Sequence, residues 1–398
     1  MSRLGDCYNV ADFARAAQRR LPAPLFDYIE GGADDEATLA ANTSAFERYT
    51  LRPRMMRDIR AVEMRRTVLG CELDWPLILA PTGMTRMFHT AGELGVATEA
   101  AASGAMYSLS TMATASIEAV ARASAGPKLF QLYLFADDAR NMEIIDRAKA
   151  AGFDALCVTV DTIVPGNRER DLRSGLTVPP RLNAASLLDF VRRPGWCLSY
   201  ATGGHFSLPN ISSPGSSSNL STLAAYFAAN MESNISWKRL EQFARHWGKP
   251  FAIKGLQTAE DTLIAASIGV SAVIISNHGG RQLDSSSATI DLVADIADSA
   301  GDAVEIILDG GFRRGSHIVK ALALGARACM TGRPYLYAVS AFGQPGVARL
   351  LTLLRAETVR TLALLGCASI NDLCREHVQI AAALPAFLTK PQSLELSA

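Results

Sequence analysis

The chain has 398 residues, 49% of them hydrophobic and 20% charged, and its 39 basic side chains balance its 39 acidic ones. This length allows one large α/β domain or two smaller ones. The balanced charge argues against a nucleic-acid partner or a strongly acidic one. The seven cysteines include no CxxC pair, which favours a reducing compartment and argues against zinc, so we assign no metal.

The N-terminal residues Arg3 and Asp6 are not followed by the apolar core of a secretory signal. No apolar run approaches the roughly 18 residues that a membrane-spanning helix needs. We therefore expect a cytoplasmic protein whose only membrane contact is peripheral, at the cytoplasmic face of the inner membrane.

Eight short apolar runs alternate with helical patterns, and this alternation predicts a parallel sheet. Eight such units predict an α/β fold of the (β/α)8 TIM-barrel type. We expect residues 1–70 to form an N-terminal helical extension and residues 71–385 to form the barrel. The predicted strands are Leu77–Ala80, Met106–Leu109, Leu129–Tyr133, Ala155–Val160, Phe251–Lys254, Ala272–Ile275, Val304–Leu308 and Ala328–Thr331.

The gap after the fourth strand is much longer than one helix, which predicts an inserted segment at 177–236. Its part from Pro194 to Met231 contains no Asp, Glu, Lys or Arg. Just before it, Leu187–Arg193 reads as a short basic amphipathic helix, and Trp196 follows, a pattern that suits an interfacial anchor. We expect residues 183–231 to touch a membrane surface or to shape the mouth of the site. The alternative is a solvated loop packed on a neighbouring subunit.

Polar residues follow nearly every predicted strand, at the end where (β/α)8 barrels carry their functional residues. The sixth strand is followed by Ser276–Asp284, which contains His278, two glycines and Arg281. Imidazole moves protons near neutral pH, and a guanidinium can hold a carboxylate by two parallel hydrogen bonds. The pattern predicts a site for an anionic substrate that loses a proton.

The loops after strands seven and eight combine glycine with arginine, in Asp309–Gly315 and Gly332–Pro334. Such barrels bind phosphate at these two loops through backbone N–H groups and a helix N-terminus. The sequence therefore predicts a phosphorylated cofactor.

These motifs, together with Asn167–Asp171 and Lys320–Ala326, resemble the FMN-dependent L-2-hydroxy acid dehydrogenases and oxidases, a family that includes glycolate oxidase, L-lactate dehydrogenase and (S)-mandelate dehydrogenase. The resemblance runs from Asp27 to about Cys367. The chain looks most similar to the membrane-associated bacterial dehydrogenases, because Arg193–Trp196 falls in the insertion that those enzymes use at the membrane.

The resemblance implies that His278 is the catalytic base and that Asp161 stabilises its protonated form. Arg281 would hold the substrate carboxylate, with Tyr28 hydrogen-bonding to it, and Tyr133 would contact the substrate hydroxyl. A buried carboxylate that orients an imidazole raises its basicity, which agrees with the first assignment.

The same resemblance implies FMN as cofactor. Arg168 would be a second cation near the substrate, and Lys254 would stabilise negative charge on reduced flavin. The remaining matches would bind FMN, and they are Pro81, Thr82, Gly83, Ser110, Gln131, Thr159, Ser276, Asp309, Gly311, Arg313, Gly332 and Arg333.

Two departures bear on the substrate. Met112 stands where glycolate oxidase has tryptophan, which leaves room for a lactate- or mandelate-like acid. Gly83 stands where glycolate oxidase has alanine, and at this position the chain resembles the dehydrogenases. We expect a homo-oligomer, a tetramer, that passes electrons to a quinone or another acceptor.

Three alternatives stay open. The first is an oxygen-using oxidase of the same family. The others are a different FMN barrel, such as an isomerase of isoprenoid diphosphates, and a non-catalytic FMN-binding protein. Neither of these two would need the set of Tyr28, Asp161, His278 and Arg281.

Overall fold

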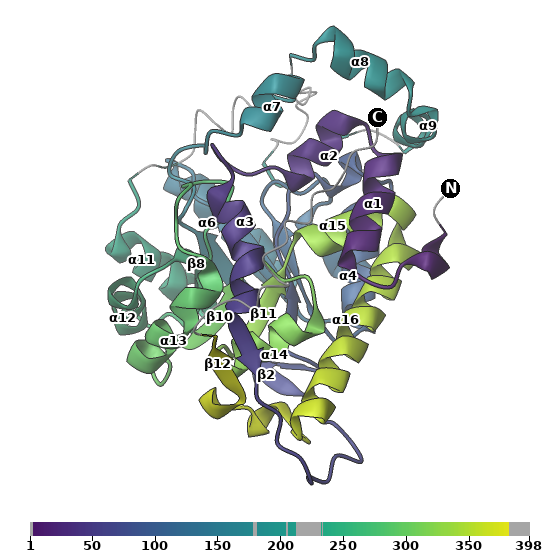
Figure 1. Ribbon diagram of the computed structural model, residues 1–398. Helices are drawn as coiled ribbons and strands as arrows, with labels where there is room; N and C mark the ends of the chain where they lie inside the picture. The colour runs from purple at the N-terminus through teal and green to yellow at the C-terminus, as the bar shows by residue number, and fades with distance from the viewer. Residues whose placement is uncertain (1–2, 178–180, 204–205, 212–231, 233, 382–398) are drawn as a thin grey trace.

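The computed structural model describes residues 3–177, 181–203, 206–211, 232 and 234–381. Eight parallel strands close into a barrel in the order β10-β11-β4-β5-β6-β7-β8-β9 (Figure 1). The barrel strands are β4 (Leu77–Leu79), β5 (Met106–Ser110), β6 (Lys128–Tyr133), β7 (Ala155–Thr159), β8 (Phe251–Leu256), β9 (Ala272–Ile275), β10 (Glu305–Asp309) and β11 (Ala328–Thr331). All eight predicted strands are thus confirmed, with ends that move by no more than two residues.

The barrel strands are predominantly apolar because both of their faces are buried. Alternate residues, such as Ile78, Met106 and Ile274, pack together in one cluster inside the barrel. Their neighbours, such as Leu77, Leu79 and Ile275, pack in the larger cluster that includes residues of the surrounding helices. Neighbouring strands pair in parallel around the ring, as at Ile307 of β10 and Ala328 of β11, with one register shift between Lys254 and Leu256 where β8 pairs with β9.

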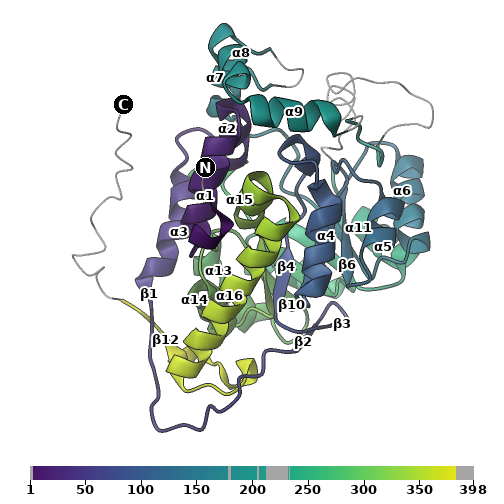
Figure 2. The same cartoon turned by 90° about the vertical axis from the view of Figure 1, so that its right-hand side faces the viewer.

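The helices surround the barrel, with the long α16 running beside α15 and α4 (Figure 2). They are α1 (Val10–Arg20), α2 (Ala23–Glu30), α3 (Ala37–Ser44), α4 (Gly92–Ala102), α5 (Ile117–Ala123), α6 (Asp138–Ala150), α7 (Glu169–Ser174), α8 (Ala184–Val191), α9 (Pro194–Thr202), α11 (Trp237–Trp247), α12 (Ala259–Ser267), α13 (Thr289–Ala300), α14 (Gly315–Ala323), α15 (Arg333–Phe342) and α16 (Gln344–Leu365). Short 3-10 turns are η1 (Leu4–Asp6), η2 (Ala45–Arg48), η3 (Thr85–Met87), η4 (Ile370–Asp372) and η5 (Arg375–His377).

The N-terminal extension contains the expected helices α1 to α3, but it also contains strands that the sequence reading missed. β1 (Tyr49–Leu51) pairs antiparallel with β12 (Val378–Ile380), far away in the sequence. β2 (Arg66–Val68) and β3 (Cys71–Leu73) form a hairpin across the expected boundary at residue 70. Val68 and Leu73 join the cluster inside the barrel, so this hairpin covers one end of the barrel core.

The described part of the insertion forms α8 and α9, which lie with α7 at the same end of the molecule as α2 (Figures 1 and 2). Of the predicted segment 177–236, residues 178–180, 204–205, 212–231 and 233 lie outside the described residues. In the part of the chain that the structure describes, no helix is long and apolar enough to cross a membrane.

Trp196, which was expected at a membrane interface, is half-buried, and its membrane contact stays a prediction. The indole N–H donates to Met87 O at 3.1 Å, and the ring packs against the main core. The indole therefore faces inward, because its N–H finds a backbone carbonyl there. The apolar side chains that α8 and α9 expose are instead Leu187, Leu188, Val191, Leu198 and Tyr200.

Candidate active site

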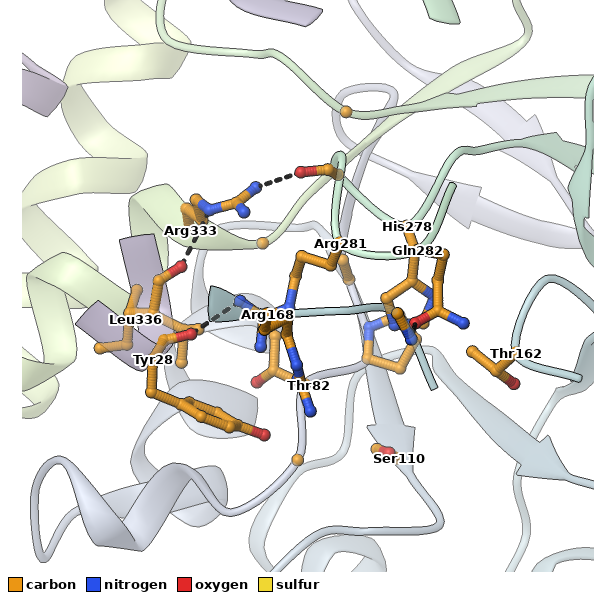
Figure 3. Close-up of a pocket in the computed structure, with 18 of the residues that line it drawn as sticks. Tyr28, Thr82, Ser110, Thr162, Arg168, His278, Arg281, Gln282, Arg333 and Leu336 are labelled. Atoms are coloured by element: carbon orange, nitrogen blue, oxygen red, sulfur yellow. Dashed lines mark hydrogen bonds between the residues drawn. The ribbon is translucent and has the colours of Figure 1, made fainter. Parts of the chain in front are cut away.

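A cavity of about 610 Å³ opens at the carboxyl ends of the barrel strands (Figure 3). Most of the residues expected at the site line it, namely Tyr28, Pro81, Thr82, Gly83, Ser110, Met112, Tyr133, Thr159, Arg168, Lys254, His278, Arg281, Asp309, Gly311, Arg313, Gly332 and Arg333. The other three lie one layer behind and hydrogen-bond to lining residues. These are Gln131, Asp161 and Ser276.

His278 is held at the end of β9 by a hydrogen bond to Asp161 and by an unusual backbone. Its Nδ1 lies 2.9 Å from Asp161 Oδ1, and its Nε2 lies 3.5 Å from the Tyr133 hydroxyl. Its φ is 57°, and Gly279 and Gly280 continue with φ of 66° and 75°. A left-handed conformation at a residue other than glycine costs roughly 1 kcal/mol or more, and such strain concentrates at functional sites. The two glycines let the chain stay left-handed while it turns away from the strand.

Asp161 is the buried partner of this imidazole. Burial by itself opposes ionisation, but the charge and hydrogen bond of His278, with a further contribution from Lys254, hold the pKa of Asp161 below its usual value. The carboxylate is therefore charged near neutral pH. Its second oxygen, Oδ2, is buried and accepts no hydrogen bond from the described residues.

Arg281 projects toward α2, which carries Tyr28. Its Nη1 donates to Tyr28 O at 2.7 Å and to Gly31 O at 2.9 Å, and its guanidinium lies 5.0 Å from the centre of the Tyr28 ring. Arg168 approaches the same ring at 5.5 Å and forms an ion pair with Asp171 at 3.2 Å. Burial, followed by the charge of Arg168, lowers the pKa of Arg281 to about 10, so it is cationic near neutral pH. Two cations near one aromatic ring make this side of the cavity suited to an anion.

Lys254 lines the cavity and contacts Ser276 and Asp309, which also contact each other. Its Nζ donates to Ser276 Oγ at 2.7 Å and lies 2.8 Å from Asp309 Oδ2, while the Ser276 hydroxyl donates to the same carboxylate at 2.9 Å. Burial alone would lower the pKa of Lys254, but the carboxylates of Asp309 and Asp161 raise it overall. The site therefore keeps a fixed positive charge in a water-poor place.

Several buried polar atoms fit a flavin ring because they have no hydrogen-bond partner among the described residues. Gln131 Oε1 accepts from the Ser110 hydroxyl at 2.9 Å, yet Gln131 Nε2 bonds to none of the described residues. Thr159 Oγ1 and Thr331 Oγ1 are likewise buried without a partner in the described chain. Buried polar groups are almost always hydrogen-bonded, so these three donors point to a polar ligand. The sequence reading missed Thr331, although it ends a barrel strand like the others.

The end of the cavity near β10 and β11 suits a phosphate. Gly311 has a φ of 75°, and a Cβ there would lie 1.9 Å from Asn42 O, so only glycine fits. Gly332 directly precedes α15, which turns the free N–H groups of that helix toward the cavity. The Arg313 guanidinium donates, among the described residues, only to Phe312 O.

Arg333 was expected to bind the phosphate, but three of its N–H groups bind backbone carbonyls of the protein. Its guanidinium donates to Ile29 O, Gly279 O and Gly31 O, each at 2.9 Å. It thereby ties α2 to the loop that carries His278 and keeps two of its five N–H groups for a ligand.

The outer wall of the cavity is more apolar than the sequence reading predicted. Gly83 packs so closely on Met112 that a Cβ at 83 would lie 3.0 Å from Met112 Cβ. Pro165 lines the cavity, as expected of the loop after the fourth strand. Further lining side chains that the sequence analysis missed are Met84, Phe88, Ile163, Leu172, Leu176, Gln282 and Leu336. Ile163 lies in the same loop as Pro165, which is the sequence signal that could have identified it.

The description of the matching family model is FMN-dependent dehydrogenase, and the match covers residues 17–380. The chain is 40% identical over 371 residues to an L-lactate dehydrogenase of Caulobacter sp. (strain K31), covering 92% of this chain and 97% of that protein. It is 37% identical over 377 residues to glycolate oxidase 1 of Oryza sativa subsp. indica, covering 94% and 96%.

A crystal structure of the monotopic membrane protein (S)-mandelate dehydrogenase matches with a TM-score of 0.90 and 37% identity, over 94% of this chain and all of that chain. The buried donors and the glycine-lined phosphate end fit the cofactor that the family name specifies. The chain therefore belongs to the FMN-dependent dehydrogenase family and is an FMN-dependent oxidoreductase.

Proposed function

We propose that this enzyme oxidises an L-2-hydroxy acid to the corresponding 2-keto acid. The observation that carries the proposal is one cavity that combines a His–carboxylate pair, an arginine pair and the FMN-compatible residues. The relatives are a lactate dehydrogenase, a glycolate oxidase and a mandelate dehydrogenase, which all act on 2-hydroxy acids by name.

In this proposal Arg281 and Arg168 bind the substrate carboxylate, and the Tyr28 side chain borders it. Among the described residues, none accepts a hydrogen bond from Arg281 Nη2 or Nε, so these donors can form a two-point clamp. The clamp orients the alcohol carbon toward His278.

The proton moves to His278 Nε2. Because Nδ1–H donates to Asp161, the unprotonated Nε2 faces the cavity beside the Tyr133 hydroxyl. As the alcohol becomes a carbonyl, Nε2 accepts the leaving proton, and the Asp161 carboxylate stabilises the resulting imidazolium. FMN would supply the oxidising power, taking up the electron pair together with the second hydrogen that the alcohol loses. Lys254 supplies the positive charge that favours this electron acceptance.

FMN would be held by Gln131, Thr159, Ser110 and Ser276 at its ring and ribityl chain, and by backbone groups of Pro81, Thr82 and Gly83. Asp309, Gly311, Arg313, Gly332 and Arg333 would hold its ribityl tail and phosphate. The unpartnered atoms Gln131 Nε2 and Thr159 Oγ1 support the first assignment. The presence of all five of the other residues in the cavity lining supports the second.

The substrate is larger than glycolate. Met112 is flexible and lines the cavity together with Met84, Phe88, Ile163 and Leu176. An apolar wall of this kind stabilises an alkyl or aryl side chain by excluding water from it. We therefore place lactate- or mandelate-like acids ahead of glycolate.

The acceptor of the electrons is a quinone or another membrane-borne acceptor, and the enzyme is peripheral on a membrane. The support is an apolar patch formed by Leu187, Leu188, Val191 and Leu198 on α8 and α9, which expose 53%, 50%, 74% and 67% of their surface. Helices α8 and α9 lie at the same end of the molecule as α2 and α7 (Figure 1), whose residues Tyr28 and Leu172 line the cavity. A homotetramer would present several such patches at once and gain avidity.

The test of the function is anaerobic mixing of the purified yellow protein with L-lactate, L-mandelate and glycolate while the flavin absorbance is followed. Wild type should bleach, and His278→Ala should retain FMN but bleach at least about 10³-fold more slowly. Admitting air or a soluble quinone afterwards separates an oxidase from a dehydrogenase. Normal bleaching of a His278→Ala protein that holds FMN would refute the assignment of the base.

A further inference from the structure

The side chain of Gln282 makes three hydrogen bonds to one loop across the cavity mouth. Its Nε2 donates to Asp161 O at 3.0 Å and to Val164 O at 2.8 Å, and its Oε1 accepts from Gly166 N at 3.1 Å. In Figure 3 Gln282 lies beside His278, on the side of the cavity away from Tyr28 and Arg333. One amide thus binds three backbone groups of the loop that follows β7.

Only a primary amide matches this set of groups. Two carbonyls need two N–H donors, and one backbone N–H needs an acceptor, all within the reach of one planar head group. A glutamate at neutral pH would present acceptors to both carbonyls. A methionine or leucine would leave all three backbone groups to water.

The bonded loop carries two groups of the proposed chemistry. Asp161, at its start, pairs with His278, and Arg168, at its end, faces the Tyr28 ring. The loop also packs closely against Arg281, the residue before Gln282, since a Cβ at Gly166 would lie 2.2 Å from Arg281 O. The position of the loop relative to His278 and Arg281 therefore depends on contacts made at residues 281 and 282.

We infer that Gln282 is a positioning residue, which fixes the loop 161–168 so that the Asp161 carboxylate and the Arg168 guanidinium face the substrate together. This inference rests on the proposed roles of Asp161, His278 and Arg168. Gln282 itself transfers no proton and need not touch the substrate. Its effect is to hold two loops, from strands β7 and β9, in one arrangement.

A positioning role makes a different prediction from a structural one. Misplacing reacting groups by about 1 Å can cost roughly 10²-fold in rate without unfolding the protein. The loss should therefore appear in the rate of flavin reduction. It should also be smaller when Arg168, one of the groups being positioned, is already absent.

The experiment measures anaerobic flavin reduction by the substrate that wild type reduces fastest, in a double-mutant cycle of Gln282→Met, Arg168→Met and the double variant. FMN content and thermal midpoint are recorded for each protein. The matched control is Gln344→Met, because Gln344 donates to Glu99 at 2.7 Å, remote from the cavity. Gln282→Glu is measured in parallel, since it keeps the side-chain length but loses both donors.

We expect Gln282→Met to retain FMN and to lose roughly 10- to 100-fold in the limiting rate of flavin reduction. Substrate deuterated at C2 should lower that rate by the full isotope effect, because breaking the C2–H bond then limits it. In the Arg168→Met background the same change should cost less than about half as much on a logarithmic scale. Gln344→Met should stay within about twofold of wild type.

Reduction by Gln282→Met within threefold of wild type, or losses that simply multiply in the double variant, would overturn the inference. So would loss of FMN from both Gln282 variants, because the residue would then serve folding. His278→Ala, run alongside, separates the two proposals. If it reduces the flavin normally, the proposed function fails whatever Gln282 does, and if only the Gln282 results fail, the function stands.

Discussion

Replacing Arg281 by methionine tests the substrate clamp most directly. The side chain lines the cavity, and its Nη1 is occupied by Tyr28 O and Gly31 O, which fix the orientation of the remaining donors. Methionine keeps much of the length and removes the charge and the planar fork. Lysine would restore the charge but not the fork, so Arg281→Lys separates these two contributions.

The size of the effect follows from the two hydrogen bonds that the free edge of the guanidinium can give a carboxylate. Each hydrogen bond to a charged group contributes about 1.5–3 kcal/mol, so losing both costs about 3–6 kcal/mol. That range corresponds to roughly 10²- to 10⁴-fold in kcat/KM. Arg168→Met should cost less, because the Arg168 side chain is 30% exposed and already paired with Asp171.

The assay is stopped-flow flavin bleaching over a range of substrate concentrations, which separates affinity from the limiting rate. Arg281→Met should be defective in both, because a two-point clamp binds the substrate and also orients it. FMN content serves as the folding control, since the variant removes the Arg281 donor from Tyr28 O and leaves Gly31 O with Arg333 Nη2 as donor. If Arg281→Met retains FMN and keeps kcat/KM within threefold of wild type, the clamp assignment is wrong.

Three further predictions concern substrate size, membrane contact and pH. Met112→Trp should fill the space beside Gly83 and shift preference from mandelate toward glycolate, which kcat/KM on both acids measures; equal losses on both would argue against a steric role. Changing Leu187, Leu188 and Val191 together to aspartate should abolish pelleting with anionic vesicles while leaving flavin reduction by substrate within about twofold; pelleting at the wild-type level would exclude the patch. Because the pKa of Asp161 is lowered in the folded protein, the stability that its charge contributes is complete above about pH 4 and is lost as the pH falls below its folded pKa. The difference in thermal midpoint between wild type and Asp161→Asn should therefore be constant from pH 5 to 7 and shrink under acid.

The barrel was predictable because its strands are buried on both faces. The run Ala272–Ile275 is apolar throughout, the run Ala328–Thr331 is apolar up to the threonine at its end, and both match the structure at each end. The short strands β1 and β12 could not be predicted, because each has three residues and a partner about 330 positions away. Their pairing depends on tertiary contacts and not on local pattern.

The site was predictable at the strand ends and less so in the loops between them. Lys254 and Asp309 end apolar strands, where a lone charge is costly, and the structure pairs them at 2.8 Å. The direction of Trp196 could not be predicted, because a tryptophan next to arginines can contact either lipid or the protein. Its direction depends on Met87 O, which the sequence does not place nearby.

The left-handed backbone of His278 explains why the sequence motif and the geometry belong together. A strand that continued in extended conformation past Ile275 would carry the imidazole on along the barrel wall. With φ of 57° at His278 and two left-handed glycines after it, the chain turns at once, and the imidazole meets Asp161 from the neighbouring loop. The strain of that turn is offset by the hydrogen bond to Asp161, by the bond from His278 N to Ser276 Oγ at 3.0 Å, and by the three carbonyl contacts of Arg333. A conformation that local preference disfavours is thus stabilised by contacts from α2, β7 and α15, and the same contacts assemble the candidate active site.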